Sequence, residues 1–401
     1  MTYDFTTNLD RHGRDAMAVD ADQAFGLDIA HTVKPGFDRI PMWVADMNFP
    51  TYPGIPAALC ERAAHPAFGY FMPPDAYYQA ICSWHANRKG VTDLQRDDIG
   101  YENGVLGGLI SALRVFCSQG DPVLVHSPTY IGFTGVLRRN GFHIVHSPLR
   151  RDGDGIWRMD LANMEEKIRR YRIHALVLCS PHNPTGRVWS GEELAAVMEL
   201  CRRYDVYVVA DEIWSDLLRP GQKHIATQSV SDDARNRTVA LYAPSKTFNL
   251  AGLVGSYHVI YNTRLRDRVR RQGALSHYNE MNVLSMHALI AAYSAGGAEW
   301  VDELCRVLAD NVDLACDHLS RIPGLQMMKP QATYMLFVDA ASWCAAHAVD
   351  IETLLRRGIE VGVLWQDGRP FGGEATIRFN LASPAARIAE AMERLERYVF
   401  V

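Results

Sequence analysis

Four short polar segments follow apolar runs of the sequence, and their side chains could do chemistry together. The segments span residues 180–187, 210–216, 243–249 and 378–382. They carry an amide, a pair of carboxylates, a lysine amine and a guanidinium. Alone, each segment has an ordinary explanation: a turn at Asn-Pro-Thr-Gly, a metal ligand or solvated cap at Asp-Glu, a surface Ser-Lys, or a buried ion pair for the arginine. Their chemical meaning therefore depends on whether the fold brings them together.

Lysine is scarce in this chain, so a mechanism that needs a lysine amine has few candidates. Of 41 basic residues six are lysines, which leaves 35 arginines. The lysines are Lys34, Lys89, Lys167, Lys223, Lys246 and Lys329. Arginine serves equally well wherever only a positive charge is needed on a solvated surface. We therefore expect Lys246, inside one of the polar segments, to be irreplaceable and the other five to tolerate substitution.

The elements that must position these segments are short buried strands separated by helices. Apolar runs occupy residues 122–126, 173–179, 206–210, 239–242 and 256–260. Between several of them lie amphipathic stretches such as residues 191–203, with apolar side chains at helical spacing. Continuous apolar runs indicate strands buried on both faces, and hence a mostly parallel α/β sheet. Ligands of such sheets bind at the carboxyl ends of the strands, where the polar segments should meet.

The C-terminal part of the sequence changes character after Gly296 and Gly297. A long helix with one apolar face comes next, and then strand candidates at 334–338 and 375–380, a helix at 351–357 and a glycine-rich loop at 368–373. This order predicts a smaller α+β domain. We expect three parts: an N-terminal segment (1–45) that packs with the small domain, a large α/β domain (46–295) and the small domain (296–401).

Composition excludes several classes of protein. The chain has 401 residues, 48% of them hydrophobic and 22% charged, which is ample for large cores. A net charge of −5 argues against a nucleic-acid or anionic-membrane binder. The apolar runs are too short to span a bilayer, and the start of the sequence does not have the pattern of a secretion signal. Eight scattered cysteines without a C-x-x-C pair predict reduced thiols in a cytoplasmic protein, without a metal site.

Taken together, the four segments resemble the fold-type-I pyridoxal-phosphate enzymes, the aspartate aminotransferase superfamily (class I/II). The resemblance runs from about residue 41 to residue 380. Within the superfamily the chain is most similar to the C–S lyase (cystathionine β-lyase) branch of the MalY/PatB type. That similarity rests on Pro-Met-Trp-Val-Ala-Asp-Met-Asn-Phe at 41–49, Phe-Gly-Tyr at 68–70 and Ser-Lys-Thr-Phe-Asn-Leu-Ala-Gly-Leu at 245–253. It implies a large domain with a mostly parallel, seven-stranded-type sheet, a smaller α+β domain, and the cofactor pyridoxal 5′-phosphate.

The resemblance also implies roles for individual residues. Lys246 would form the Schiff base with the cofactor and then move the α-proton of the substrate. Asp211 would keep the pyridine nitrogen protonated, and Asn183 would donate to the phenolate oxygen of the ring. Arg378 would hold the substrate carboxylate in a bidentate fork. Tyr130 would stack on the pyridine face.

Further residues would hold the cofactor phosphate. Val105 and Leu106 stand where a glycine-rich turn opens a helix, whose free amides bind anions. Ser245 can add a hydroxyl group. In this family the residue matching Tyr70 reaches the phosphate of the neighbouring subunit, so the resemblance implies a homodimer acting on a small amino-acid substrate.

Three positions depart from the family patterns around the cofactor. Aminotransferases carry an arginine eight residues after the lysine, where this chain has Val254, and many carry a serine at the position of Ala243. Loss of that arginine is expected in the lyase branch. Trp214 replaces a tyrosine or histidine, and an indole can donate a hydrogen bond but cannot transfer a proton. Trp214 therefore signals either the same donor role or a site reshaped for an unusual substrate.

The expected reaction is β-elimination from an L-cysteine conjugate or a cystathionine-like substrate, giving a thiol, pyruvate and ammonia. Transamination by the same machinery is the first alternative. A specialised biosynthetic reaction of the same lineage, such as decarboxylation or oxidative deamination of an S-cysteinyl intermediate, is the second. A regulatory protein that has kept the fold but lost catalysis is the third, and the complete set of site residues argues against it.

Overall fold

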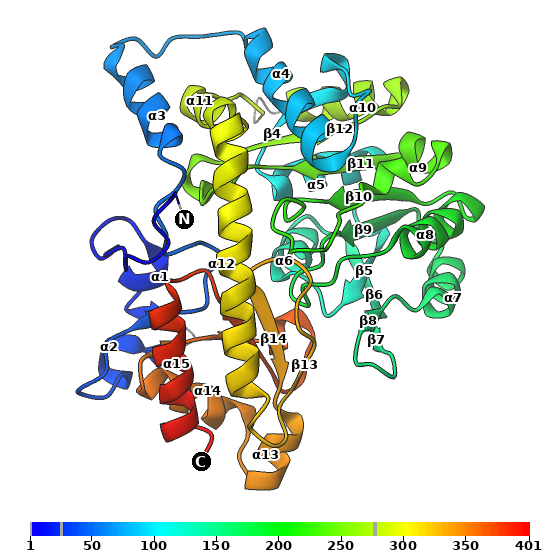
Figure 1. Ribbon diagram of the computed structural model, residues 1–401. Coiled ribbons are helices and arrows are strands. Elements are labelled where there is room, and N and C mark those ends of the chain that lie inside the picture. The colour runs from blue at the N-terminus through cyan, green and yellow to red at the C-terminus, as the bar shows by residue number, and fades with distance from the viewer. Residues whose placement is uncertain (1, 25–26, 276–278) are drawn as a thin grey trace.

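A seven-stranded sheet forms the largest element of the chain. The structure, a computed structural model, describes residues 2–24, 27–275 and 279–401. The strand order is β4-β12-β11-β10-β9-β5-β6 (Figure 1). β12 is antiparallel to both of its neighbours and the remaining pairs are parallel, which confirms the expected mostly parallel sheet. The strands are β4 (Ile99–Asn103), β5 (Pro122–Ser127), β6 (His143–Pro148), β9 (Ala175–Cys179), β10 (Tyr207–Asp211), β11 (Thr238–Tyr242) and β12 (Gly255–Val259).

Helices cover both faces of this sheet, which explains why its central strands are apolar throughout. One hydrophobic cluster joins alternate strand residues to helices on the first face, and another joins the intervening residues to helices on the second. Alternation along β10 sends Val208 and Ala210 to the first cluster and Val209 to the second. The first face is covered by α4 (Asp75–Trp84), α7 (Leu161–Tyr171) and α8 (Gly191–Arg203), and the second by α5 (Val105–Phe116), α6 (Ile131–Arg139) and α10 (Thr263–Ala274).

A second, smaller sheet lies in the C-terminal part. Its four antiparallel strands run β13-β14-β17-β16, with bounds β13 (Gln326–Met327), β14 (Met335–Asp339), β17 (Thr376–Asn380) and β16 (Gln366–Asp367). Helices α13 (Ala341–His347), α14 (Ile351–Glu360) and α15 (Ala385–Tyr398) accompany it. This is the mixed arrangement expected of an α+β unit.

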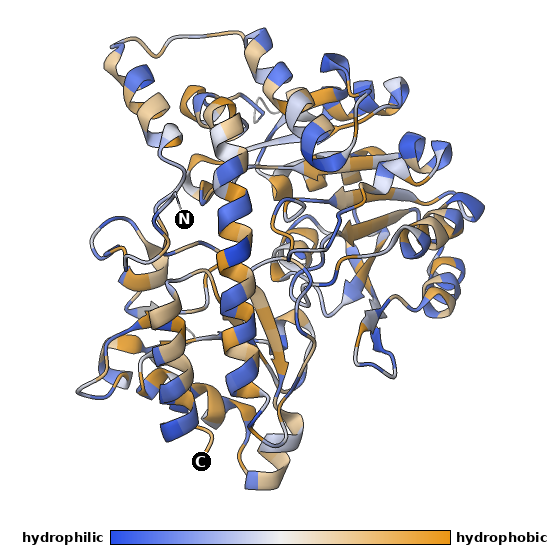
Figure 2. Ribbon diagram, in the orientation of Figure 1, coloured by the Kyte–Doolittle hydropathy of each residue, from blue (hydrophilic) through white to orange (hydrophobic). Residues whose placement is uncertain are grey.

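One long helix, α12 (Ala295–Leu319), packs against both parts of the molecule. Trp300 and Leu304 belong to the hydrophobic cluster on the first face of the large sheet, whereas Val312 and Leu319 belong to the cluster of the small sheet. Its polar and apolar residues alternate along its length in Figure 2. Gly296 and Gly297 lie in the first turn of α12, so they are part of this helix and do not interrupt the chain before it. The division into domains at residues 45 and 295 stays a prediction.

The N-terminal segment packs against both parts. The strand β3 (Ile40–Pro41) pairs with β15 (Val363–Leu364), and α2 (Ile29–Thr32) contacts α14. The Phe5 ring meets those of Phe49 and Trp300, with centroids 5.3 and 5.5 Å away. Ile40 belongs to the hydrophobic cluster of the small sheet and Phe49 to the cluster on the first face of the large sheet, so the chain passes from one part to the other between these residues.

The structure corrects one expectation about the lysines. Lys89 follows α4, is only 8% exposed, and its Nζ donates to Asp216 Oδ1 at 2.8 Å. Lys89 therefore does not lie on a solvated surface, and because removing it would leave a buried carboxylate without its main partner, we now expect its substitution to destabilise the protein. Lys34, Lys223 and Lys329 are exposed, as expected.

Two other expectations concern the whole chain. All eight cysteines are free thiols. Within the described ranges, none of the helices has both the length and the apolar character that crossing a membrane requires.

Candidate active site

The polar segments that come after the strands meet at a cavity of about 280 Å³. It lies where β9, β10 and β11 end and α5 begins, as expected for a parallel sheet. Most of the residues expected at the site line it: Val105, Leu106, Tyr130, Asn183, Asp211, Trp214, Ser245 and Lys246. Arg378 lies next to it, bonded to Asn183. Tyr70 does not reach it within the same chain.

Lys246 presents its amine to this cavity from the loop after β11. Its Nζ donates to the carbonyl oxygen of Ala45 at 2.9 Å. Burial and the nearby charge of Arg378 lower the pKa of Lys246 to about 8, although Asp46 and Asp211 oppose this shift. The shift increases the neutral fraction of the amine near neutral pH, and a nucleophile and a proton acceptor both require the neutral form.

Asp211 is the last residue of β10 and is 3% exposed. Strand alternation directs it to the same side as Val209, towards α5, and its neighbour Glu212 to the opposite side. Its Oδ1 accepts from the Ile213 amide at 3.1 Å. Burial raises the pKa of Asp211 to about 7, and the Ile213 amide and the Lys246 charge reduce this rise. A carboxyl in such a position needs a cationic partner to stay ionised, and a protonated pyridine nitrogen would supply one.

Arg378 reaches the site from the middle of β17 and is 4% exposed. Its Nη2 donates to the Trp43 carbonyl at 2.9 Å and its Nη1 to Asn183 Oδ1 at 3.3 Å. The guanidinium lies over the Phe371 ring, 4.4 Å from the centroid. Burial lowers the pKa of Arg378 to about 10, so it remains charged at neutral pH. The planar fork fits a carboxylate.

The first turn of α5 forms another wall of the cavity. Its cap residue, Gly104, has φ = 84° and ψ = 147°, a positive-φ conformation that a side chain would strain. The first intrahelical bond closed by the cap is Gly108 N–H to Gly104 O at 3.0 Å. The amides of Val105, Leu106 and Gly107 have no intrahelical partner and can bind an anion, beside the hydroxyl of Ser245.

No arginine lines the described part of this cavity. Val254, which stands at the position of the aminotransferase arginine, lines it instead and has φ = 59°. An anion bound at α5 would therefore be held by amides and hydroxyls, with Lys246 as the one cationic group among the described lining residues.

Aromatic and apolar side chains complete the walls. Tyr130 and Ile213 line the cavity, as does Trp214, which is 2% exposed. The Trp214 ring lies 5.8 Å from Lys246 Nζ and meets the Tyr334 ring edge-on at 4.9 Å. No hydrogen bond from the Trp214 indole N–H to another described residue is present, so this donor remains for a ligand.

A short stretch of backbone, residues 43–47, closes the site from the N-terminal side, and side chains from the core donate to every one of its carbonyls. Arg378 donates to Trp43, Asn380 to Val44 and Asp46, and Asn249 to Met47. The Ala45 carbonyl oxygen accepts hydrogen bonds from Lys246 Nζ and from the Tyr334 hydroxyl, the latter at 3.0 Å. This segment is therefore rigidly placed beside the lysine amine.

Sequence reasoning missed several residues of the site. Ala45 contributes a backbone carbonyl, which leaves no trace in the residue type. Ile213 and Cys179 line the cavity as ordinary apolar residues, and Tyr334 acts through Ala45. The motif at 41–49 and the strand at 334–338 were the available signals for Ala45 and Tyr334, but neither indicated contact with Lys246.

The segment that carries Tyr70 projects from the body of the chain. Phe68, Tyr70 and Met72 are 57%, 110% and 85% exposed, unusual values for large apolar side chains. Their segment joins α3 (Gly54–Ala64) to α4 along the upper edge of Figure 1.

This combination of groups around one cavity is typical of a pyridoxal-phosphate enzyme of the aminotransferase-like class. The groups are a buried lysine amine, a buried carboxylate at a strand end, an arginine fork and a helix N-terminus. Comparison with known proteins leads to the same class. The family model of aminotransferase class I and II matches residues 47–395. The chain belongs to this family, which confirms the resemblance seen in the sequence.

Individual relatives point to the lyase branch. The chain is 36% identical to the cystathionine beta-lyase PatB of Bacillus subtilis over 362 residues, covering 90% of this chain and 92% of PatB. It is 30% identical to protein MalY of Escherichia coli, covering 98% of both chains. The PLP-bound C–S lyase from Staphylococcus hominis superimposes with a TM-score of 0.89 at 29% identity, covering 100% of this chain and 98% of that one.

Proposed function

We propose that this protein is a pyridoxal-phosphate-dependent C–S β-lyase, which cleaves L-cysteine conjugates or cystathionine-like substrates. The observation that carries the proposal is the placement of the Lys246 amine on a cavity bounded by Asp211, Asn183 and the first turn of α5, with Arg378 adjacent. The names of the relatives support the lyase outcome. Val254 at the usual position of the aminotransferase arginine supports it as well.

The residues of the cavity fit the cofactor. The free amides of Val105 and Leu106 and the hydroxyl of Ser245 suit a phosphate group. Asp211 suits a protonated pyridine nitrogen, because its raised pKa shows that it lacks a cationic neighbour close enough to offset burial. Asn183 and the Trp214 indole would offer donors to the phenolate oxygen of the cofactor, and Tyr130 and Ile213, which line the same cavity, would contact its ring. When bound, pyridoxal phosphate supplies an electron sink for a carbanion at the α-carbon of an amino acid.

The chain's own residues bind the substrate and move its proton. Arg378 holds the α-carboxylate, because its planar fork is buried, charged and held over the Phe371 ring. Lys246 accepts the α-proton at Nζ, and the Ala45 carbonyl fixes the position of that amine. The Tyr334 hydroxyl donates to the same carbonyl and holds it in place.

The overall reaction balances with one water molecule. The Cα–H and Cβ–S bonds of the cysteine conjugate break, and the sulfur leaves as a thiol. Water then releases the nitrogen as ammonia, and the carbon skeleton leaves as pyruvate. No oxidant or reductant is consumed.

The test is product analysis with S-methyl-L-cysteine and L-cystathionine. We expect equal amounts of thiol and pyruvate without any added keto acid. Transamination would instead require an added keto-acid acceptor and would leave the C–S bond intact. Absence of thiol from a panel of cysteine conjugates would contradict the lyase proposal.

Trp214 favours a second candidate, a specialised reaction of the same lineage on an S-cysteinyl intermediate. The indole replaces a group that can transfer a proton with one that can only donate a hydrogen bond. Mass spectrometry of the products with and without oxygen separates this outcome, because decarboxylation releases carbon dioxide and oxidative deamination requires oxygen.

We further propose a homodimer in the cytoplasm. The exposed Phe68, Tyr70 and Met72 suit a surface buried against a second copy, with Tyr70 directed to the partner's phosphate site. The free thiols fit a reducing compartment.

A further inference from the structure

A buried ionic cluster lies behind the active site, on the face of the large sheet opposite Asp211. It comprises Trp84, Lys89, Ser215, Asp216 and Thr247, and is called the Asp216 cluster below. Asp216 Oδ1 accepts from Lys89 Nζ at 2.8 Å and from Trp84 Nε1 at 3.0 Å. Lys89 also donates to Ser215 Oγ at 2.8 Å, and Thr247 Oγ1 lies 3.4 Å from Asp216 Oδ2.

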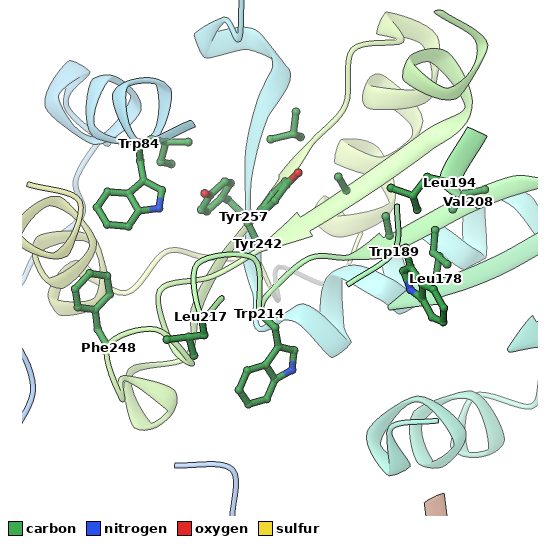
Figure 3. Packing of buried hydrophobic residues seen from close by; sticks show 14 of the residues in the cluster. Trp84, Leu178, Trp189, Leu194, Val208, Trp214, Leu217, Tyr242, Phe248 and Tyr257 are labelled. Atoms are coloured by element: carbon green, nitrogen blue, oxygen red, sulfur yellow. The ribbon is translucent and has the colours of Figure 1, made fainter. Parts of the chain in front are cut away.

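The cluster is joined directly to two residues of the active site. Asp216 follows Trp214 by two positions, and Thr247 follows Lys246 by one. The Ser215 amide donates to the Glu212 carbonyl at 3.0 Å and the Leu217 amide to the Trp214 carbonyl at 3.0 Å, so the intervening turn is tight. Figure 3 shows the Trp214 indole directed away from Trp84, Tyr242 and Tyr257. The turn thus presents Trp214 to the cavity and Asp216 to the cluster.

The other end of the turn is fixed as well. Glu212 is fully buried and accepts from His224 Nε2 at 2.7 Å, the Thr227 amide at 2.8 Å and the Tyr242 hydroxyl at 2.7 Å. Trp214 therefore lies between two anchored carboxylates. Only Asp216 also contacts the residue after Lys246.

Stability alone does not account for this ion pair. Burying two charges costs several kcal/mol per ion, and apolar residues of similar volume serve about as well. Asp216 remains ionised. Burial raises its pKa, but the charges of Lys89 and Arg88 outweigh burial, so the pKa lies below its usual value. Its partner is a lysine in a chain with few lysines, and the compact ammonium bonds to Ser215 and Asp216 at once. What the pair provides is a fixed geometry between α4, the Trp214 turn and the lysine loop.

We propose that Asp216 is a positioning residue for Lys246 and Trp214. Trp84 at the end of α4 and Lys89, five residues further along, fix Asp216 in place. Asp216 in turn fixes the backbones of the Trp214 turn and of Thr247. Loss of its charge lets the amine of Lys246 and the indole move within the cavity. The inference rests on the proposed function only for its effect on turnover, because the position of the amine can be measured without catalysis.

The first experiment measures the reactivity of Lys246 in cofactor-free protein. Purified wild-type and Asp216→Asn proteins are methylated with formaldehyde and cyanoborohydride over a range of pH, and peptides are quantified by mass spectrometry. The exposed Lys223 serves as an internal reference within each sample. We expect the labelling of Lys246 relative to Lys223 to change at least threefold in Asp216→Asn.

The second experiment measures the loaded enzyme. We expect Asp216→Asn to lower kcat at least tenfold with KM within about threefold, and to alter the visible circular dichroism of the bound cofactor. The matched control is Asp98→Asn, which removes a 2.7 Å ion pair with Arg266 outside the cavity. The control should lower the melting temperature yet leave kcat and the labelling ratio unchanged.

The outcomes decide the proposal separately from the lyase function. Wild-type labelling of Lys246 together with wild-type kcat in Asp216→Asn would overturn it. If Asp216→Asn does not fold, the charge-free pair Lys89→Met with Asp216→Leu replaces it, and the same two results decide. If the wild-type protein releases no thiol, the proposed function fails, but the labelling result still decides the role of Asp216.

Discussion

Lys246 and Asp211 titrate abnormally for the same reason, because both are buried beside one cavity. Burial lowers the pKa of the lysine to about 8 and raises that of the aspartate to about 7. Each shift favours the neutral form, as expected for groups removed from water. A bound cofactor with a cationic ring nitrogen would restore the charge on Asp211, so cofactor binding and the ionisation of this residue are linked.

The first prediction concerns Lys246→Arg. A guanidinium cannot form a Schiff base or accept a proton at neutral pH, so turnover should fall at least about a thousandfold. Thiol release from S-methyl-L-cysteine measures the effect. Lys223→Arg, which changes an exposed lysine, is the matched control and should keep full activity. Comparable activity in the two variants would refute the proposed role of Lys246.

The second prediction concerns pH and the cofactor-free protein. The pKa of Asp211 is raised on folding, so the native state binds the proton more tightly than the unfolded state. This contribution to stability is complete below pH 3.8 and is lost as the pH rises through about 7. The Asp211→Asn protein has no proton to lose at this position, so its stability does not fall with this titration. Its melting temperature relative to that of the wild type should therefore increase between pH 4 and pH 7. A pH-independent difference would contradict the raised pKa.

At the scale of elements, the sequence predicted the central strands but missed the outer ones. The apolar runs correspond to β5, β9, β10, β11 and β12. The edge strands β4 and β6 carry Gly, Glu, Asn and His residues, and each has exposed or half-buried positions, whereas β9 is buried throughout. Their apolar signal is correspondingly weak.

The same limit applies to the site. Residues that act through side-chain type, such as Lys246, Asp211 and Arg378, were predicted by motif. Ala45 was missed because it acts through its carbonyl, and the burial of Lys89 was missed because its partner Asp216 is 127 positions away. Contacts of that range are decided by packing, which a single sequence does not display.

The third prediction concerns the first turn of α5. Gly104→Ala adds a side chain at φ = 84°, which costs about 1–2 kcal/mol and should displace the free amides. We expect the affinity for pyridoxal phosphate to fall about fivefold to thirtyfold, measured by equilibrium titration. Gly120→Ala is the control, because Gly120 has φ = 89° and no neighbour within 4 Å of an added Cβ. It should lose similar stability without losing cofactor affinity.

At the scale of the whole molecule, the exposed segment with Tyr70 is the part that a single chain leaves unexplained. It continues directly into α4, and the short π-helix η1 (His85–Lys89) that follows α4 ends at Lys89. If the segment reaches the site of a second copy, each active site depends on both chains.

The fourth prediction tests that arrangement with mixed dimers. Tyr70→Ala and Lys246→Ala proteins should each be nearly inactive alone. After unfolding and refolding together in equal amounts, half of the dimers are hybrids, and each hybrid has one site with both residues intact. About a quarter of wild-type activity should return. Recovery of no activity, despite hybrids detected by native mass spectrometry, would contradict a site shared between the two chains.

The helix α12 has a consequence for how the molecule comes apart. Its two ends pack in different hydrophobic clusters. If one cluster unfolds, apolar residues at that end of the helix become exposed while the other end is still packed. Heat should therefore melt both parts in one cooperative transition, with calorimetric and van't Hoff enthalpies in agreement. We expect the continuous helix to couple the two sheets into one thermodynamic unit.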